Sequence, residues 1–193
     1  MLGTMSISLS LLSELIRARR TSMLVDRDRA VPVELVGQLC ELAMWAPNHK
    51  RTWPWRFALF TGDGRARLGE AFVADMIAAD YGDDAKRAKT LTKYLRTPAV
   101  LVVGAAPQVR DGLRADDRYA VAAGIQNLLL GATAAGLASY WSTPPVSEPP
   151  TTLELCQFDP GTHLIGAIYL GWPADQHVET PVRPPVELLH VPA

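Results

Sequence analysis

The chain has 193 residues, of which 48% are hydrophobic and 20% charged, and its formal net charge is −1. These values are typical of one soluble globular domain with a substantial core, so we expect a single domain over residues 1–193 with residues 1–7 disordered. The near-neutral charge predicts neither a nucleic-acid nor a membrane partner. No basic segment followed by a long apolar run occurs near residue 1, which favours a cytoplasmic protein.

The first half of the chain is predicted to hold helices and one clear strand. Leucine and isoleucine recur at helical spacing over residues 8–18, which predicts a first helix. A second helix begins near Pro32, a residue that suits a first turn, and Pro47 ends it. Residues 55–61 are predicted to form a strand, and two charge-rich surface helices are expected between residues 65 and 95.

The second half is predicted to be equally mixed. The expected elements are a buried strand over 99–105, a long helix over 118–135, a strand over 137–142, a short helix over 147–158 and a buried strand over 164–170. The proline-rich tail from Pro173 to Ala193 cannot form a regular helix. No glycine-rich phosphate loop of the Rossmann or P-loop kind follows any predicted strand, so a phosphorylated cofactor would have to be held by side-chain cations.

Arg19-Arg20-Thr21-Ser22 follows the first predicted helix. Two guanidinium groups beside two hydroxyls offer paired donors that match phosphate oxygens. The alternative is a solvated basic helix end, which also interacts favourably with the helix dipole. From these four residues alone, the solvated end is the simpler interpretation.

The segment from Ala46 to Phe57 combines planar rings and cations between a helix and a strand. Such a loop suits a flat, electron-accepting heterocycle, with His49 and Lys50 stabilising negative charge on it and tryptophans beside it. The alternative is an ordinary structural loop in which Trp53 and Trp55 pack inward. That alternative is favoured for Trp55, because it opens a predicted strand.

Other candidates carry weaker signals. Tyr140 to Pro145 places aromatic and hydroxyl groups at a strand end, where they either line a pocket or simply pack, and Arg183 is either a second phosphate ligand or an exposed tail residue. Acidic residues in charge-rich turns, Asp116 and Asp117 among them, are expected to be solvated. Two cysteines are too few for a disulfide framework and favour buried, reduced thiols, and the four histidines lack metal-ligand spacing.

Taken in order, several segments resemble the nitroreductase family of FMN enzymes, in its compact branch. The matching segments are Arg19 to Ser22, Pro32 to Pro47, Pro54-Trp55-Arg56-Phe57, Gly124 to Leu128 with Ala135-Gly136-Leu137, Tyr169 to Pro173, and Arg183. Each segment is weak alone, but all of them in order at compatible spacing are a specific signal. The resemblance covers nearly the whole chain.

The resemblance implies an α+β, nitroreductase-like fold, in which a central mixed or antiparallel sheet is flanked by helices. It also implies an intertwined homodimer with FMN in the interface. Carried over by position, Arg19, Arg20, Thr21 and Arg183 would bind the phosphate and ribityl chain, while Trp141, Ser142 and Thr143 would line the flavin. Trp45 and His49 would reach the flavin from the partner subunit.

The implied activity is the reduction of nitroaromatic, quinone or related electron-poor small molecules. NADH or NADPH would donate two electrons in a ping-pong mechanism, with Arg20, His49 and Lys50 as candidates for stabilising charge on the reduced ring. A flavin-binding protein for storage or sensing, without turnover, is the alternative.

The chain departs from the family pattern before Pro54-Trp55. Most members carry an asparagine and a glutamine there, and these amides contact the flavin ring, whereas this chain has Arg51 and Trp53. An indole offers one donor and no acceptor, so it cannot replace an amide's contacts.

Overall fold

The computed structural model describes residues 8–174 and 179–192, so the disorder expected for residues 1–7 lies outside the described part of the chain. Helices and strands follow one another in mixed order, as the sequence predicts. The elements are α1 (Leu9–Ala18), α2 (Val33–Met44), η1 (His49–Arg51), β1 (Trp55–Thr61), α3 (Gly64–Ala78), α4 (Asp84–Lys93), η2 (Tyr94–Arg96), β2 (Ala99–Ala105), α5 (Asp111–Ala134), β3 (Ala138–Ser142), α6 (Pro150–Leu155) and β4 (His163–Gly171).

The four strands form one sheet in the order β1-β2-β4-β3, and each neighbouring pair is antiparallel. Every residue of β2 is buried. Leu101 and Val103 belong to one core cluster, and Val100 and Val102 belong to a second. Successive side chains on a strand point to opposite faces, so β2 supplies both cores. Of the two expected arrangements, mixed or antiparallel, the four strands of the described residues take the antiparallel one.

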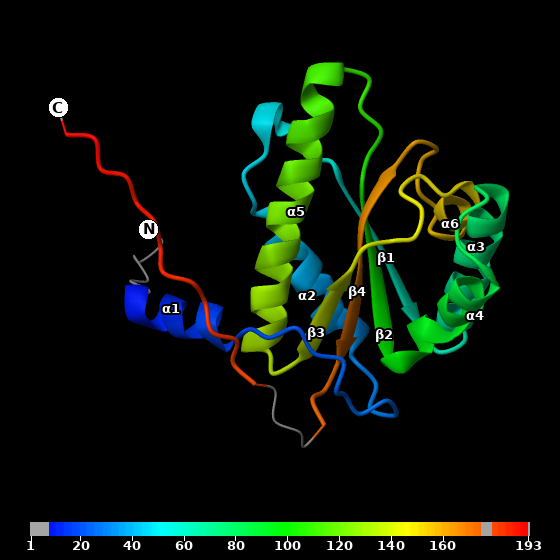
Figure 1. Cartoon of the computed structure of the whole chain (residues 1–193), viewed down its shortest axis with the longest axis horizontal. Coiled ribbons are helices and arrows are strands. Elements are labelled where there is room, and N and C mark those ends of the chain that lie inside the picture. The colour runs from blue at the N-terminus through cyan, green and yellow to red at the C-terminus, as the bar shows by residue number, and fades with distance from the viewer. Residues whose placement is uncertain (1–7, 175–178, 193) are drawn as a thin grey trace.

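Helices cover both faces of this sheet and give a three-layer arrangement. α2 and α5 lie on one face, and α3, α4 and α6 lie on the other (Figure 1). The first core contains apolar residues of α2, α5 and the sheet, and the second contains residues of α3, η2, α6 and the sheet. The expected α+β architecture, a central sheet flanked by helices, is confirmed.

The long helix α5 lies unusually close to its neighbours. A Cβ atom at Gly124 would lie 2.6 Å from the carbonyl oxygen of Ala43 and 2.6 Å from Nε1 of Trp55. Only glycine allows this approach, because Ala43 of α2 and Trp55 at the start of β1 are both buried and leave no room for a Cβ atom. Gly124 therefore sets the distance of α5 from α2 and from the start of β1.

Two predicted helices have wrong bounds. α5 begins at Asp111, not at Arg118, because its first turns are polar and show no apolar periodicity even though they are helical. α6 spans only Pro150–Leu155 instead of residues 147–158. Its start is fixed by Pro149 and Pro150, since a residue before proline avoids the helical conformation.

The N-terminal helix and the tail lie outside the layers (Figure 1). The Ser8 hydroxyl caps α1 by accepting from the backbone N–H of Leu11, yet no residue of α1 is buried. The tail over residues 179–192 has no helix or strand, and its apolar side chains are more than three-quarters exposed: Val182, Val186, Leu188, Leu189 and Val191. Nowhere in residues 8–174 and 179–192 does a helix have the length and apolar character needed to cross a membrane.

Candidate functional site

A hollow of about 650 Å³, here called the arginine hollow, lies where α1, α5 and the tail meet. Its lining residues are Ile16, Arg17, Arg19, Arg20, Gln126, Thr180, Pro181 and Arg183. Four guanidinium groups thus share one hollow, and no carboxylate is among these lining residues. The family resemblance implied this grouping for Arg19, Arg20 and Arg183.

Arg20 joins two walls of the arginine hollow. Its Nη2 donates to the Thr180 hydroxyl at 2.6 Å, and its Nη1 donates to the backbone carbonyls of Arg19, at 2.9 Å, and Arg17. The segment after α1 is therefore tied directly to the tail. Sequence reasoning missed Thr180, because no motif distinguished it from the rest of the tail.

The donors of the arginine hollow suit a phosphate group. Guanidinium groups give paired, charge-assisted hydrogen bonds to phosphate oxygens, and the Thr180 hydroxyl and Gln126 amide add neutral donors. Such a set does not suit a metal ion, and the described residues contain no group of three or more His, Cys, Asp or Glu able to hold one. The hollow thus fits the phosphorylated end of a cofactor.

The two hydroxyl residues after Arg20 attach this segment to the sheet. Thr21 forms an isolated parallel bridge with Ser139 of β3, and the Ser22 N–H donates to the Ser139 carbonyl at 2.9 Å. The Thr21 side chain is exposed and does not line the arginine hollow. The bridge places the arginines next to the edge strand of the sheet.

β3 ends in the aromatic and hydroxyl residues that the sequence predicted to line a flavin. The Trp141 indole donates from Nε1 to the Ile165 carbonyl at 3.2 Å and is 37% exposed. It lies over Gly166, where an added Cβ would come within 2.5 Å of its Nε1. Ser142 donates from its hydroxyl to the Thr143 carbonyl at 3.4 Å. These residues lie at the strand end, but the arginine hollow does not include them.

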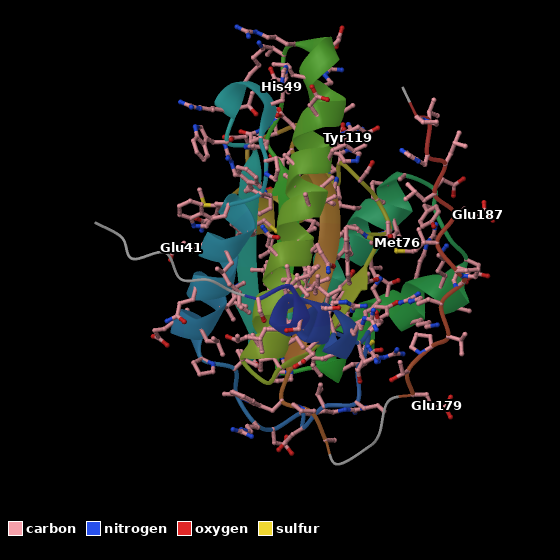
Figure 2. The ribbon with its side chains drawn as sticks, turned by 90° about the vertical axis from the view of Figure 1, so that its left-hand side faces the viewer. Glu41, His49, Met76, Tyr119, Glu179 and Glu187 are labelled. Atoms are coloured by element: carbon pink, nitrogen blue, oxygen red, sulfur yellow. The ribbon has the colours of Figure 1, made fainter. Side chains whose placement is uncertain are left out.

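His49 lines a second hollow of about 360 Å³, here called the His49 hollow, whose walls are Pro47, His49, Asp116, Tyr119, Ala120 and Ala123. His49 and Tyr119 lie toward the same end of α5 in Figure 2. The two hollows follow the same exposed face of α5, because Ala123 of one and Gln126 of the other are about one helical turn apart.

The loop that carries His49 has a strained backbone. Lys50, Arg51 and Trp53 have φ values of 59°, 52° and 53°, in the left-handed region that favours glycine. Each such residue costs about 1–2 kcal/mol. The surrounding structure must therefore hold this loop, and strain of this kind is concentrated at functional sites.

A chain of hydrogen bonds fixes the same loop; we call it the Asp117 network. One carboxylate oxygen of Asp117 accepts from the Thr52 hydroxyl, and the other accepts from the Gln108 amide at 3.0 Å. The Asn48 amide donates to Thr52 Oγ1 at 3.0 Å and accepts from the Trp53 N–H at 2.9 Å. Asp117 is only 2% exposed, so the expectation that it is solvated is wrong.

The tryptophans around this loop differ sharply in burial. Trp55 is 5% exposed and packs inward, as predicted, but Trp53 is 55% exposed and only tilts against Trp55, with ring centroids 6.2 Å apart. Trp45, at the end of α2, is 79% exposed. Lys50 and Arg51 are exposed as well. The single chain thus presents two exposed indoles and two exposed cations within a few residues of His49 along the sequence.

The cysteines take no part in either hollow. Both are free; Cys156 is buried and Cys40 is half-buried. Burial raises the pKa of the Cys40 thiol to about 11 and that of the Cys156 thiol to about 12. Both are therefore protonated near neutral pH, in line with the predicted reduced, structural thiols.

Comparison with known proteins gives one consistent answer. The sequence profile of the nitroreductase family matches residues 16–172. YfhC of Bacillus subtilis strain 168, named as an NAD(P)H nitroreductase whose activity is unproven, is 27% identical over 92% of this chain and 91% of its own length.

Solved structures agree with the sequence comparison. A nitroreductase-like family protein from Bacillus cereus is 29% identical, with a TM-score of 0.78 over 96% of this chain and 99% of that one. A nitroreductase from Bacteroides fragilis, solved with bound FMN, shares the fold at 20% identity, with a TM-score of 0.72 over 93% of this chain and 97% of its own.

Proposed function

This chain belongs to the nitroreductase family, and from that premise we propose that it is an FMN-dependent oxidoreductase. It takes electrons from NADH or NADPH and passes them to electron-poor small molecules such as nitroaromatics or quinones. Two similar proteins support this: YfhC is named as an NAD(P)H nitroreductase, and the Bacteroides fragilis nitroreductase holds FMN.

The arginine hollow is the observation that carries the proposal. FMN ends in a phosphate that bears up to two negative charges, and Arg19, Arg20 and Arg183 supply matching donors without a competing carboxylate in the lining. Arg20 is already oriented by Thr180 and by backbone carbonyls. Thr21 follows directly and would lie beside the ribityl chain.

The flavin ring would lie toward the end of β3. Trp141, Ser142 and Thr143 would line it there, and the loop of the second copy that carries His49 and Lys50 would place positive or polar groups near it to stabilise negative charge. When bound, FMN supplies the capacity to accept two electrons and a proton from one reactant and to return them to another. The chain's residues bind the cofactor, orient it and exclude water.

A homodimer completes this site in our proposal. The apolar side chains of α1 and the tail are exposed in one chain, with Leu9 at 81% and Leu188 and Leu189 each at 86%. Exposed apolar surface of this extent marks an interaction site. A second copy would cover it, and Trp45 and His49 of the partner subunit would then reach the flavin.

A visible absorbance spectrum of the purified protein with FMN tests the proposal first. We expect a bound flavin spectrum that bleaches on anaerobic addition of NADH or NADPH and recovers with a nitroaromatic or a quinone. Bound FMN that neither nucleotide reduces would instead indicate a storage or sensing protein. A protein that takes up no FMN would refute both functions.

Paired variants then test the arginine hollow itself. Arg20→Gln and Arg183→Gln should each weaken FMN binding by roughly 10- to 100-fold, the loss expected for one hydrogen bond between charged groups. Arg67→Gln is the matched control, because Arg67 is an exposed arginine of α3 on the opposite side of the sheet. Equal FMN affinity in all three variants would place the phosphate elsewhere.

A further inference from the structure

The loop from His49 to Trp53 combines exposure with strain, and the fold has to hold it. Lys50, Arg51 and Trp53 adopt left-handed conformations that each cost free energy, yet the loop lies on the surface with little apolar packing of its own. An exposed loop with such strained residues returns to an unstrained conformation unless other contacts hold it in place. The Asp117 network is what the structure offers for that purpose.

Each bond of the Asp117 network acts on a different part of the loop. Asp117 is anchored in α5 and receives hydrogen bonds from Thr52 and Gln108 on its two oxygens. Asn48 binds the Thr52 hydroxyl and the Trp53 N–H, so it spans the strained residues from one end to the other. The rigid long helix thereby fixes both ends of the loop.

Gln108 gives the network a second attachment to the fold. Its side-chain oxygen also accepts from the Arg110 N–H at 3.1 Å, just before α5 begins. The Asp117 carboxylate is 2% exposed, so its hydrogen bonds are shielded from water. A buried carboxylate with neutral donors on both oxygens is costly unless its contacts are kept.

We propose that Asp117 is a positioning residue of the cofactor site. Through Thr52 and Asn48 it holds the strained loop so that His49 lines its hollow on α5 and the Trp53 indole stays exposed toward a flat ring. This inference rests on the proposed function, and it adds a residue that lines neither the arginine hollow nor the His49 hollow.

The Trp53 side chain determines which kind of ligand the positioned loop can contact. An exposed, oriented indole presents an apolar face and one N–H donor, where the family pattern has an amide. Held in place, it contributes contact area to an aromatic ligand at little further entropic cost. The expected ligand of the loop is therefore a planar aromatic ring, as in FMN.

The first test uses trypsin and requires no cofactor. Lys50 and Arg51 are exposed tryptic sites within the strained loop. We expect Asp117→Asn and Thr52→Val to raise the rate of cleavage after these residues by about tenfold, as expected when a hydrogen bond to a charged group is removed. Thr52→Ser keeps the hydroxyl and should restore resistance. Unchanged cleavage in both variants would overturn the proposal.

The second test measures FMN affinity against a matched control. Asp75 is another buried carboxylate, 1% exposed, which accepts hydrogen bonds from Thr151 and Thr152 at the start of α6. Asp75→Asn should lower thermal stability but leave FMN affinity unchanged. Asp117→Asn should weaken FMN binding by about tenfold, even when its thermal stability equals that of Asp75→Asn. This is the effect expected from the loss of one hydrogen bond to a charged group.

The two tests distinguish a failure of the proposed function from a failure of the role proposed for Asp117. Wild-type protein that binds no FMN would refute the proposed function, and the tryptic rates would still decide whether Asp117 holds the loop. A loop that loosens without any change in FMN affinity would show that Asp117 positions a segment outside the site. That result would overturn the role proposed here while leaving the proposed function intact.

Discussion

Gly124→Ala is the perturbation whose effect the structure defines most closely. The added Cβ would lie 2.6 Å from the Ala43 carbonyl oxygen and 2.6 Å from Trp55 Nε1, about 1 Å inside ordinary contact distance. Neither atom can move alone, because one belongs to the backbone of α2 and the other to a buried indole. α5 must therefore shift away from α2 and β1.

The magnitude follows from two opposing effects. Overpacking of a close-packed core costs typically 1–3 kcal/mol, whereas replacing a helical glycine with alanine stabilises the helix by about 1 kcal/mol. Two rigid contacts put the overpacking cost in the upper part of that range, about 2–3 kcal/mol. After the helical gain of about 1 kcal/mol, we expect Gly124→Ala to lower the free energy of unfolding by roughly 1–2 kcal/mol. For a chain of this size, each kcal/mol lowers the Tm by about 2–4 °C.

The assay is urea unfolding followed by circular dichroism at one fixed protein concentration. Gly37→Ala is the matched control, since Gly37 also lies in a helix and an added Cβ there meets nothing within 4 Å. We expect Gly37→Ala to be as stable as the wild type or more stable. If Gly124→Ala equals or exceeds Gly37→Ala in stability, the close approach of α5 does not limit the fold.

Three further predictions follow from the exposed tail and from the shifted pKa values. Leu188→Asp combined with Leu189→Asp should convert the proposed dimer to a monomer in light scattering; a dimer of unchanged affinity would show that the tail is not in the interface. Burial, and then neighbouring cations, lower the pKa of Lys93 to about 8 from 10.5, so Lys93 binds more protons in the unfolded chain between these values and its own contribution to stability should grow from pH 8 to pH 10. Lys93→Gln should remove that part of the pH dependence in urea unfolding, and an unchanged slope would contradict it. Cys40 and Cys156 should resist iodoacetamide at pH 8 in the folded protein, because burial raises both pKa values; mass spectrometry that detects rapid labelling of either would refute this.

The sequence predicts the strands more accurately than the ends of the helices. The predicted strands at residues 55–61 and 99–105 have the same bounds as β1 and β2. Turns and prolines bound these apolar runs, so their limits are visible in the residues themselves. The first turns of α5 contain only Leu113 and Ala115 as apolar residues, which are too few to form a periodic pattern that marks where the helix begins.

The same missed helix start explains why Asp117 was misjudged. With the helix beginning at Arg118, Asp117 falls in a turn, where a carboxylate is ordinarily solvated. With α5 beginning at Asp111, Asp117 lies four residues before Val121 and seven before Gly124, on the buried face of the helix. A predicted helix that began at Asp111 would have placed the Asp117 carboxylate on the buried face, where it needs hydrogen-bond donors.

The candidate site divides along similar lines. The residues around Arg19 and Arg20 alone favoured a solvated helix end, and only the family resemblance implied a role for them in binding phosphate; the structure brings Arg183 to them from the other end of the chain. The adjacency of the two hollows along α5 depends on long-range packing, which a sequence pattern does not encode. The roles of all the candidate residues toward a cofactor, Trp45 and Thr143 among them, stay predictions.

Because no residue of α1 is buried, α1 and the rest of the fold should unfold at different points. The sheet and its two helical layers enclose their own cores, whereas α1 is held to the rest by surface contacts and by the bonds that follow it. Dilution or mild denaturant should therefore release α1, together with the arginines behind it, while the sheet is still intact. Cofactor retention and the integrity of the fold would then be separate properties, each with its own midpoint, and the bleaching of retained flavin would report only the first.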